Sequence, residues 1–148
     1  MSSRSLDDLV PTVKEKAVAF QKACRDAGIE VLIYCTLRDY DEQNALYTQG
    51  RTTKGPNPTA KRPLGNIVTC AKAGESWHNF GRAFDFVPIV HGKPAWNSAS
   101  LYATCGSIAE NVGLEWAGRW TGPLREMAHC QDRGGMTLAE ARSERARA

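Results

Sequence analysis

The fold is constrained most by a helical repeat of apolar residues that is followed directly by a strand-like segment. Between residues 6 and 27, apolar side chains recur every three or four positions, so a helix there has one apolar face. Ser5 suits the N-cap of this helix, and Gly28 suits its C-terminal cap. Residues 29–36 are rich in β-branched and aromatic side chains and predict a largely buried strand. The chain therefore begins as a mixed domain of helix and strand.

The same mixture continues along the chain. Residues 41–49 predict a second helix that ends before Gly50. Residues 82–90 predict another strand, ended or bulged by Pro88. Residues 98–112 carry apolar side chains at helical spacing and predict a third helix. The pattern is that of an α+β fold.

The remaining segments predict loops around one domain. Residues 51–74 hold many Gly, Pro, Thr, Lys and Asn residues and predict a long loop, with residues 67–70 as an additional edge strand. Residues 137–148 predict a helix or a frayed tail. Because there is no repeat and no interdomain linker, we expect residues 1–148 to form a single compact domain with its core at about 5–131 and no separate wall-binding domain.

Composition excludes several classes of protein. A chain of 148 residues with 42% apolar side chains suits one packed core. The net charge of +3 is too mild to indicate a nucleic-acid partner. No apolar run approaches the roughly 20 residues that span a bilayer, and the N-terminus lacks the apolar stretch of a signal peptide. Five cysteines without a C-x-x-C pair predict small buried side chains of a protein that folds in a reducing cytosol.

One segment carries half of a possible metal site. His78 and Asp85 are seven residues apart and bracket a glycine. In the predicted strand, Ala83 and Asp85 share one face, while Phe84 and Phe86 face the core. An imidazole and a carboxylate are normal zinc ligands, although two ligands do not make a site.

A second segment supplies what the first lacks. Glu126 stands three residues before His129, so a helical turn would bring both side chains to one side. His129 would complete a set of three ligands with His78 and Asp85, leaving a fourth position for water, and Glu126 would be the base. A lone E-x-x-H is more often structural, but two complementary halves in one short chain predict a catalytic zinc site.

Three blocks resemble the M15 zinc peptidases, which include D-Ala-D-Ala carboxypeptidases and dipeptidases and phage L-alanyl-D-glutamate endopeptidases. The first block, SWHNFGRAFDF, matches the pattern S-x-H-x-x-G-x-A-x-D. The second, TLRDYDEQNALYTQGRT, and the third, GLEWAGRW followed by E-x-x-H, resemble two further blocks of the family. The resemblance runs from Val31 to Gln131 and implies a zinc site in a cleft on a small antiparallel sheet packed with helices.

The resemblance also implies roles for individual residues. By position, His78, Asp85 and His129 match the zinc ligands, and Glu126 matches the general base. Arg38 takes the place of the arginine that binds the carbonyl oxygen as it becomes an oxyanion.

Four more positions lie in the matched blocks. Gln43 and Ser76 match polar positions that line the cleft, where they contact the substrate or support other site residues. Trp116 and Trp120 either line the cleft or pack in the core. Cys130, next to a zinc ligand, would point to the opposite face of a strand, and none of the cysteines is expected to bind the metal.

Three functions follow, in order of preference. The first is an L-alanyl-D-glutamate endopeptidase that cleaves peptidoglycan stem peptides as a monomeric phage endolysin, held in the host cytoplasm until it is released to the cell wall. The second is a D-alanyl-D-alanine carboxypeptidase or dipeptidase with the same mechanism. The third is a non-catalytic zinc-containing binding module, against which Glu126 and Arg38 argue, because a pure binder needs neither.

Overall fold

The protein is built on a small antiparallel sheet, in a computed structural model that describes residues 2–148. The strand order is β1-β2-β5-β4, and β3 also pairs with β2. The strands are β1 (Glu30–Cys35), β2 (Ala83–Val90), β3 (Lys93–Pro94), β4 (Glu115–Trp116) and β5 (His129–Gln131). Every pair is antiparallel, so the predicted α+β class with a small antiparallel sheet is confirmed.

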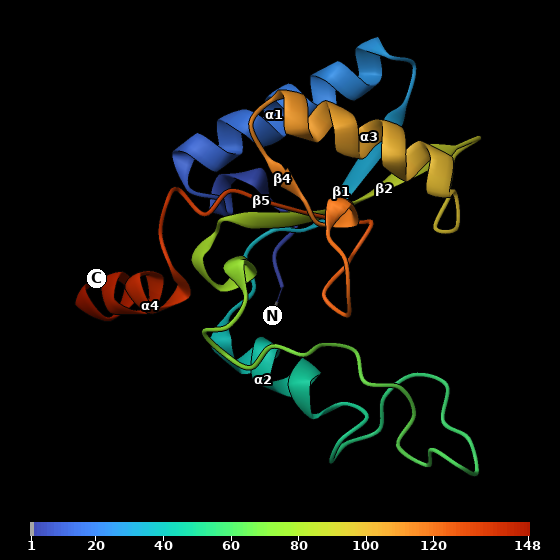
Figure 1. The fold of residues 1–148 in the computed structure, drawn as a ribbon, viewed down its shortest axis with the longest axis vertical. Coiled ribbons are helices and arrows are strands. Elements are labelled where there is room, and N and C mark those ends of the chain that lie inside the picture. The colour runs from blue at the N-terminus through green and yellow to red at the C-terminus, as the bar shows by residue number, and fades with distance from the viewer. Residues whose placement is uncertain (1) are drawn as a thin grey trace.

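Helices cover the sheet unevenly. Helices α1 (Pro11–Asp26) and α3 (Ala99–Asn111) pack together over one face. In Figure 1, α2 (Tyr40–Thr48) and the long loop after it extend away from the other side of the sheet, and α4 (Leu138–Arg147) lies apart from them. Three 3₁₀ turns complete the structure, at Leu6–Asp8, Trp77–Phe80 and Ala117–Arg119.

The core lies between the sheet and the α1–α3 layer. Phe84 and Phe86 of β2 are fully buried there, with ring centres 5.5 and 5.1 Å from that of Phe20 on α1. Asp85 lies between them in sequence and therefore faces the opposite side, as the alternation predicts. A single strand thus anchors itself in the core with two rings and presents a carboxylate on its free face.

The first helix starts later than its apolar repeat suggests. Residues 6–8 form a separate 3₁₀ turn, capped by the Ser5 side chain, and α1 begins at Pro11. Proline lacks an N–H group and disfavours helical backbone in the residue before it, so Val10 stays extended and the helix starts at the proline. Gly28, with φ of +81°, follows the helix end as predicted.

The first strand is less buried than predicted. β1 pairs only with β2 and so forms an edge of the sheet, where Leu32 remains 44% exposed. Its register with β2 shifts between Ile33 and Cys35: Ile33 pairs with Phe86, and Cys35 pairs with Asp85. Two strand residues therefore stand opposite one, which is a β-bulge beside Asp85.

Two further expectations about strands are corrected. Pro88 neither ends nor bulges β2, because the strand runs on to Val90 with Pro88 in register opposite Val31. Residues 67–70 form no strand in the described chain. Their backbone is held by side chains instead, as in the bond from Arg51 to the Thr69 carbonyl, at 3.0 Å.

The remaining predictions about elements agree with the structure. Residues 51–74 contain no helix or strand within the described chain, and α2 ends just before the predicted boundary. The tail is a helix, begun by a capping box between Thr137 and Glu140. Four of the five cysteines are buried, Cys70 is exposed, and all five are free thiols. Among residues 2–148, no helix combines the length and apolar character needed to cross a membrane.

Candidate active site

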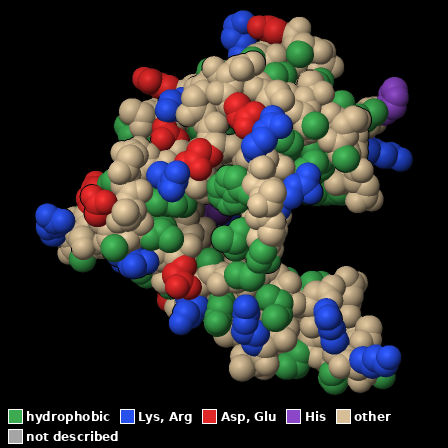
Figure 2. All heavy atoms as spheres, in the orientation of Figure 1, with side chains coloured by type: hydrophobic (Ala, Val, Ile, Leu, Met, Phe, Trp, Pro, Cys, Tyr) green, Lys and Arg blue, Asp and Glu red, His purple; other side chains and the backbone are tan. Residues whose placement is uncertain are grey.

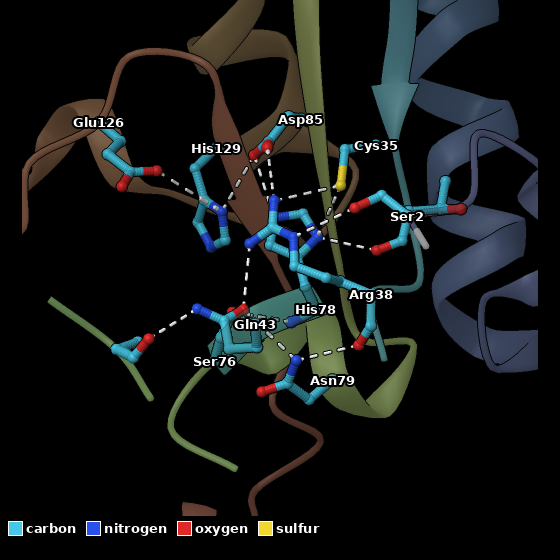
Figure 3. Close-up of polar contacts among 12 residues, drawn as sticks. Ser2, Cys35, Arg38, Gln43, Ser76, His78, Asn79, Asp85, Glu126 and His129 are labelled. Carbon is cyan, nitrogen blue, oxygen red and sulfur yellow. Dashed lines mark hydrogen bonds and ion pairs between the residues drawn. The ribbon is translucent and has the colours of Figure 1, made fainter. Parts of the chain in front are cut away.

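Three donor side chains meet on the free face of the sheet. Asp85 and His129 are register partners on β2 and β5, and Nδ1 of His129 lies 3.3 Å from Oδ1 of Asp85. His78 comes from the 3₁₀ turn Trp77–Phe80, and its Nε2 lies 3.1 Å from the same oxygen. Figure 3 shows the two imidazoles on either side of the carboxylate. The two predicted halves of the site are therefore brought together.

A tight turn connects His78 to the sheet. The Ser76 hydroxyl caps the 3₁₀ turn by accepting a hydrogen bond from the His78 backbone N–H, at 3.3 Å. Gly81 ends the turn with φ of +67°, a left-handed conformation that favours glycine. A Cβ atom at Gly81 would lie 2.8 Å from the Asp8 carbonyl oxygen. The turn can therefore deliver His78 beside β2 only because this residue has no side chain.

Each histidine is oriented by its second ring nitrogen. Nδ1 of His78 donates to the Thr36 carbonyl at 2.8 Å, and Nε2 of His129 donates to Oε1 of Gln131 at 2.8 Å. Because these nitrogens are bonded elsewhere, the other ring nitrogens, Nε2 of His78 and Nδ1 of His129, point toward Asp85. Both rings are nearly fully buried, at 3% and 8% exposed. Acceptors of this kind hold metal-binding histidines in place and increase their basicity.

The charges around this point favour a cation. Burial opposes protonation of His78, but the Asp85 carboxylate outweighs burial and raises the pKa of His78 to about 10. Burial also acts to raise the pKa of the Asp85 carboxyl, but the two histidines hold that pKa far below its usual range. Two nitrogens and one carboxylate oxygen form a normal donor set for zinc. The donors present therefore fit a zinc ion.

Cys35 lies closer to this centre than expected. Its sulfur is 3.8 Å from Nδ1 of His78, and Cys35, His78 and Asp85 form one of two possible metal-holding groups. The other group is Asp85, Glu126 and His129. His78 and Arg38 outweigh burial and lower the pKa of the Cys35 thiol. The Cys35 sulfur thus lies beside the donors, next to the His78 nitrogen that is bonded to Thr36, while Cys130 is buried in the core as predicted.

Glu126 lies at the open side of the donors. Its Oε2 is 3.9 Å from Nδ1 of His129, and its side chain is 63% exposed. The predicted helical turn is absent at this point, because His129 already belongs to β5 and Glu126 precedes it in an irregular turn. A bond from the His129 N–H to the Glu126 carbonyl, at 3.5 Å, closes that turn and keeps both side chains on one side.

Arg38 extends its guanidinium over the same face. It donates to Oε1 of Gln43 at 3.1 Å, to the Cys35 sulfur at 3.3 Å and to the Ser2 hydroxyl at 3.4 Å. Its Nη2 lies 3.9 Å from Oδ2 of Asp85. Figure 3 shows the guanidinium next to the carboxylate. A permanent cation is thus fixed beside the place where the donors converge.

The Gln43 side chain accepts the hydrogen bond that fixes the Arg38 guanidinium. This side chain is fully buried, and its Nε2 donates to the Ala71 carbonyl at 2.7 Å. Asn79 adds support by donating to the Arg38 carbonyl at 2.9 Å. The Gln43 side chain thus contacts both Arg38 and the loop. Ser76 is half-buried and lines the cleft.

One cleft of about 890 Å³ is bordered by the three donors and by Arg38, Ser76 and Glu126. Its floor is the free face of the sheet, and its walls are residues 67–71 of the long loop and the segment from Trp120 to Glu126. Figure 2 shows the hollow between the main body and the loop. Trp120 lines the cleft, with its ring centre 6.2 Å from that of His129, whereas Trp116 is buried in the core.

Three supporting groups were missed by the sequence analysis. Gln131 could have been predicted from the sequence, because it stands two residues after His129 and therefore lies on the same face of the strand. Thr36 acts through its backbone carbonyl, for which side-chain patterns carry no information. Cys35 required the register between β1 and β2, which only the tertiary structure provides.

The donor set fits a metal ion, and comparison with known proteins assigns the family. The profile of the VanY family, described as D-alanyl-D-alanine carboxypeptidase, matches residues 7–121. The chain is 39% identical over 122 residues to the peptidoglycan L-alanyl-D-glutamate endopeptidase CwlK of Bacillus subtilis, covering 76% of this chain and 67% of CwlK. The chain therefore belongs to the VanY family of M15 peptidases and is a hydrolase.

Solved structures support the fold. The L-Ala D-Glu endopeptidase ChiX of Serratia marcescens superimposes with a TM-score of 0.61 at 19% identity, covering 95% of this chain and 91% of ChiX. The D,D-pentapeptidase VanY from a VanB-type resistance cassette, solved with Zn(II), gives a TM-score of 0.62 at 16% identity, covering 90% of this chain and 83% of VanY.

Proposed function

We propose that this protein is a zinc-dependent peptidoglycan peptidase that hydrolyses the L-alanyl-D-glutamate bond of stem peptides. The observation that carries the proposal is the convergence of His78, Asp85 and His129 on one face of the sheet, with Glu126 at its open side. The 39% identity to an L-alanyl-D-glutamate endopeptidase supports the choice of bond.

His78, Asp85 and His129 would hold the zinc. When bound there, zinc supplies Lewis-acid chemistry, which makes water more acidic and polarises a carbonyl group. The bonds from the histidines to Thr36 and Gln131 keep the ring orientation constant as the metal binds. The protein's contribution at this point is a donor set arranged before the ion arrives.

Glu126 moves the proton. Its carboxylate lies in the cleft beside His129 and is largely exposed, so a water molecule and a bound peptide can both reach it. The carboxylate accepts a proton from the attacking water and gives it to the leaving amine. Its place on a turn immediately before β5 keeps its carboxylate within reach of Asp85 and His129.

Arg38 stabilises the negative charge that develops on the carbonyl oxygen. Its guanidinium is held by Gln43 and by the Cys35 sulfur, so it does not need to reorganise during the reaction. It retains donors in a fixed plane beside Asp85, which suits an oxygen that becomes an oxyanion.

A D-alanyl-D-alanine carboxypeptidase is the second candidate. The name of the matched family profile favours it, and the same residues would perform the same chemistry. The two activities differ in their products. Cleavage at L-alanine leaves a free alanine carboxylate on the sugar-linked fragment, whereas carboxypeptidase action releases free D-alanine.

Digestion of purified muropeptides tests both the activity and the bond. Zinc-loaded protein is expected to produce a sugar-linked fragment ending in L-alanine, detected by mass spectrometry. Glu126→Gln is expected to lose turnover by a factor of about 10² or more while it retains stoichiometric zinc. Glu30→Gln, the same change at the exposed edge of β1, serves as the matched control. Release of D-alanine alone, or full activity of Glu126→Gln, would overturn the proposal.

The biological setting is part of the proposal. A phage endolysin that stays in the host cytoplasm until it reaches the cell wall, acting as a monomer, is consistent with a peptidase directed at stem peptides. Lysis of cells by the protein added from outside, and a sedimentation measurement of its mass, test the two statements separately.

A further inference from the structure

A second pocket adjoins Asp85 and Glu126, next to the main cleft. It has a volume of about 390 Å³ and shares Asp85 and Glu126 with the main cleft. Its remaining walls include Tyr34, Trp96 and Tyr102. The reacting centre therefore lies between two hollows, and a substrate that crosses it has room on both sides. We refer to this second hollow as the aromatic pocket.

The fold brings its aromatic walls together from three elements. Tyr34 is the extra residue of the β-bulge opposite Asp85, and bulges often re-aim side chains near active sites. Trp96 follows β3, and its ring meets that of Tyr34 edge-on with centres 5.3 Å apart. Tyr102 comes from α3. Trp96 remains 52% exposed, which leaves a large apolar ring facing solvent at the edge of the pocket.

The two hollows differ in charge. Among the residues that the structure describes, no Lys or Arg lines the aromatic pocket. The main cleft has two cations, Arg38 and Arg142, together with Glu75. Arg142 is anchored by a bond from one guanidinium nitrogen to the Gly74 carbonyl, at 2.8 Å, and its other donors remain available. A carboxylate on the substrate is therefore matched only on the side of the main cleft.

Apart from the Asp85 and Glu126 carboxylates that it shares with the main cleft, the aromatic pocket offers neutral hydrogen-bonding groups. The hydroxyl of Tyr34, which lines the pocket, can donate or accept a hydrogen bond. The Asn97 amide, which also lines the pocket, both donates and accepts. Exposed aromatic faces beside neutral polar groups suit a ligand with apolar C–H surfaces and hydroxyl or amide groups.

We infer that the aromatic pocket is the subsite for the uncharged side of the scissile bond, namely the alanyl residue and the N-acylated sugar attached to it. The glutamyl side, which carries a free carboxylate, lies in the main cleft with Arg38 and Arg142. This inference rests on the proposed function and fixes the direction in which the peptide crosses the donors. Trp96 is then the residue that distinguishes sugar-linked peptides from free ones.

Binding of the two product halves tests the inference without catalysis. Calorimetry is carried out with N-acetylmuramoyl-L-alanine and, separately, with a γ-D-glutamyl-lysine dipeptide, using the zinc-loaded protein. Trp96→Ala is expected to weaken binding of the sugar fragment at least fivefold and to leave binding of the dipeptide unchanged. Arg142→Ala is expected to show the reverse pattern. Trp96→Phe, which keeps an aromatic ring, should recover most of the affinity for the sugar fragment.

The failures of the two proposals are distinguishable. The inference is overturned if Trp96→Ala binds the sugar fragment as tightly as the unchanged protein, if Arg142→Ala weakens both fragments equally, or if the sugar fragment does not bind up to roughly 10 mM. The proposed function fails instead if intact muropeptides are not cut at L-alanine. Circular dichroism of each variant separates loss of a subsite from loss of the fold.

Discussion

Asp85 is the residue that contacts both histidines of the site. One of its oxygens lies 3.1 Å from His78 and 3.3 Å from His129, although the three residues come from three different segments. Its position follows from Phe84 and Phe86, which turn it away from the core. Alternation along β2 predicted the face on which Asp85 lies, because alternation is a local property of a strand, while chemical type and spacing indicated His78 and His129 as its partners.

The supporting hydrogen bonds were less predictable. The bond from His78 to the Thr36 carbonyl joins residues 42 apart in sequence. Arg38 and Gln43 are close in sequence, so their contact is local. The full burial of the Gln43 side chain, however, depends on the long loop after α2. Such partners are decided by tertiary packing, which a local pattern does not contain.

Removing the acceptor from His129 tests the value of this support. Gln131→Leu leaves the Nε2–H of His129 without its partner in a buried position, so we expect zinc affinity to fall about 10- to 100-fold. Competition with a chelating dye measures the change. Gln21→Leu on α1, the same substitution away from the site, is the control and should bind zinc normally. Unchanged affinity in Gln131→Leu would contradict the assigned orientation of His129.

A substitution that keeps the positive charge tests whether the planar guanidinium group of Arg38 is required. Arg38→Lys cannot contact Gln43 and the Cys35 sulfur together with the same geometry, so we expect kcat to fall about 10²-fold with zinc content preserved. Arg119→Lys, at an exposed ion pair with Glu110, is the matched control. A variant that lost only substrate affinity, with kcat intact, would show that Arg38 binds the substrate and does not stabilise the oxyanion.

At the scale of elements, β2 serves both the core and the site. Its existence was predictable from its apolar run, but its continuation through Pro88 was not, because proline usually marks an end or an edge. The start of α1 at Pro11 was missed because the apolar repeat runs on through the preceding 3₁₀ turn. Residues 67–70 look like a strand in composition, but the Thr69 carbonyl is held by the Arg51 side chain, and the next carbonyl but one, that of Ala71, by Gln43 of α2.

The turn at Gly81 connects the 3₁₀ turn to β2, and its substitution tests that connection. Gly81→Ala imposes both a left-handed backbone on alanine and a contact of 2.8 Å with the Asp8 carbonyl. Gly28→Ala imposes only the first, because nothing lies within 4 Å of its added Cβ. We expect Gly28→Ala to cost roughly 1 kcal/mol of unfolding free energy and Gly81→Ala roughly 2 kcal/mol or more. Urea denaturation measures both, and equal losses would contradict the proposed close approach.

At the scale of the whole molecule, the cleft joins parts that are far apart in sequence. Its floor comes from β2 and β5, and its walls come from the long loop and the segment before β5. The order of the blocks along the chain predicted the family and the small sheet. The second pocket beside Asp85 was not predictable, because it depends on a bulge in β1 and on the docking of α3.

Removal of zinc should lower the stability of the entire domain. Because the proposed ligands join β2, β5 and the 3₁₀ turn, we expect zinc to bind the folded state in preference to the unfolded one. At a free zinc concentration of about 100 times Kd, we expect about 2.7 kcal/mol of stabilisation and a rise in Tm of roughly 5–10 °C. Differential scanning calorimetry with and without chelator measures the shift. Asp85→Asn should show almost none of it, and an equal shift in that variant would place the zinc elsewhere.

The two bonds of the Gln43 side chain have a mechanical consequence. Its Oε1 accepts from Arg38, while its Nε2 holds the Ala71 carbonyl in the wall of the cleft. The wall belongs to a loop with no helix or strand in the described chain, and the floor belongs to a sheet anchored in the core. The wall at Ala71 and the guanidinium of Arg38 are therefore fastened to the same amide group. We expect a displacement of the loop at Ala71 to displace the cation as well.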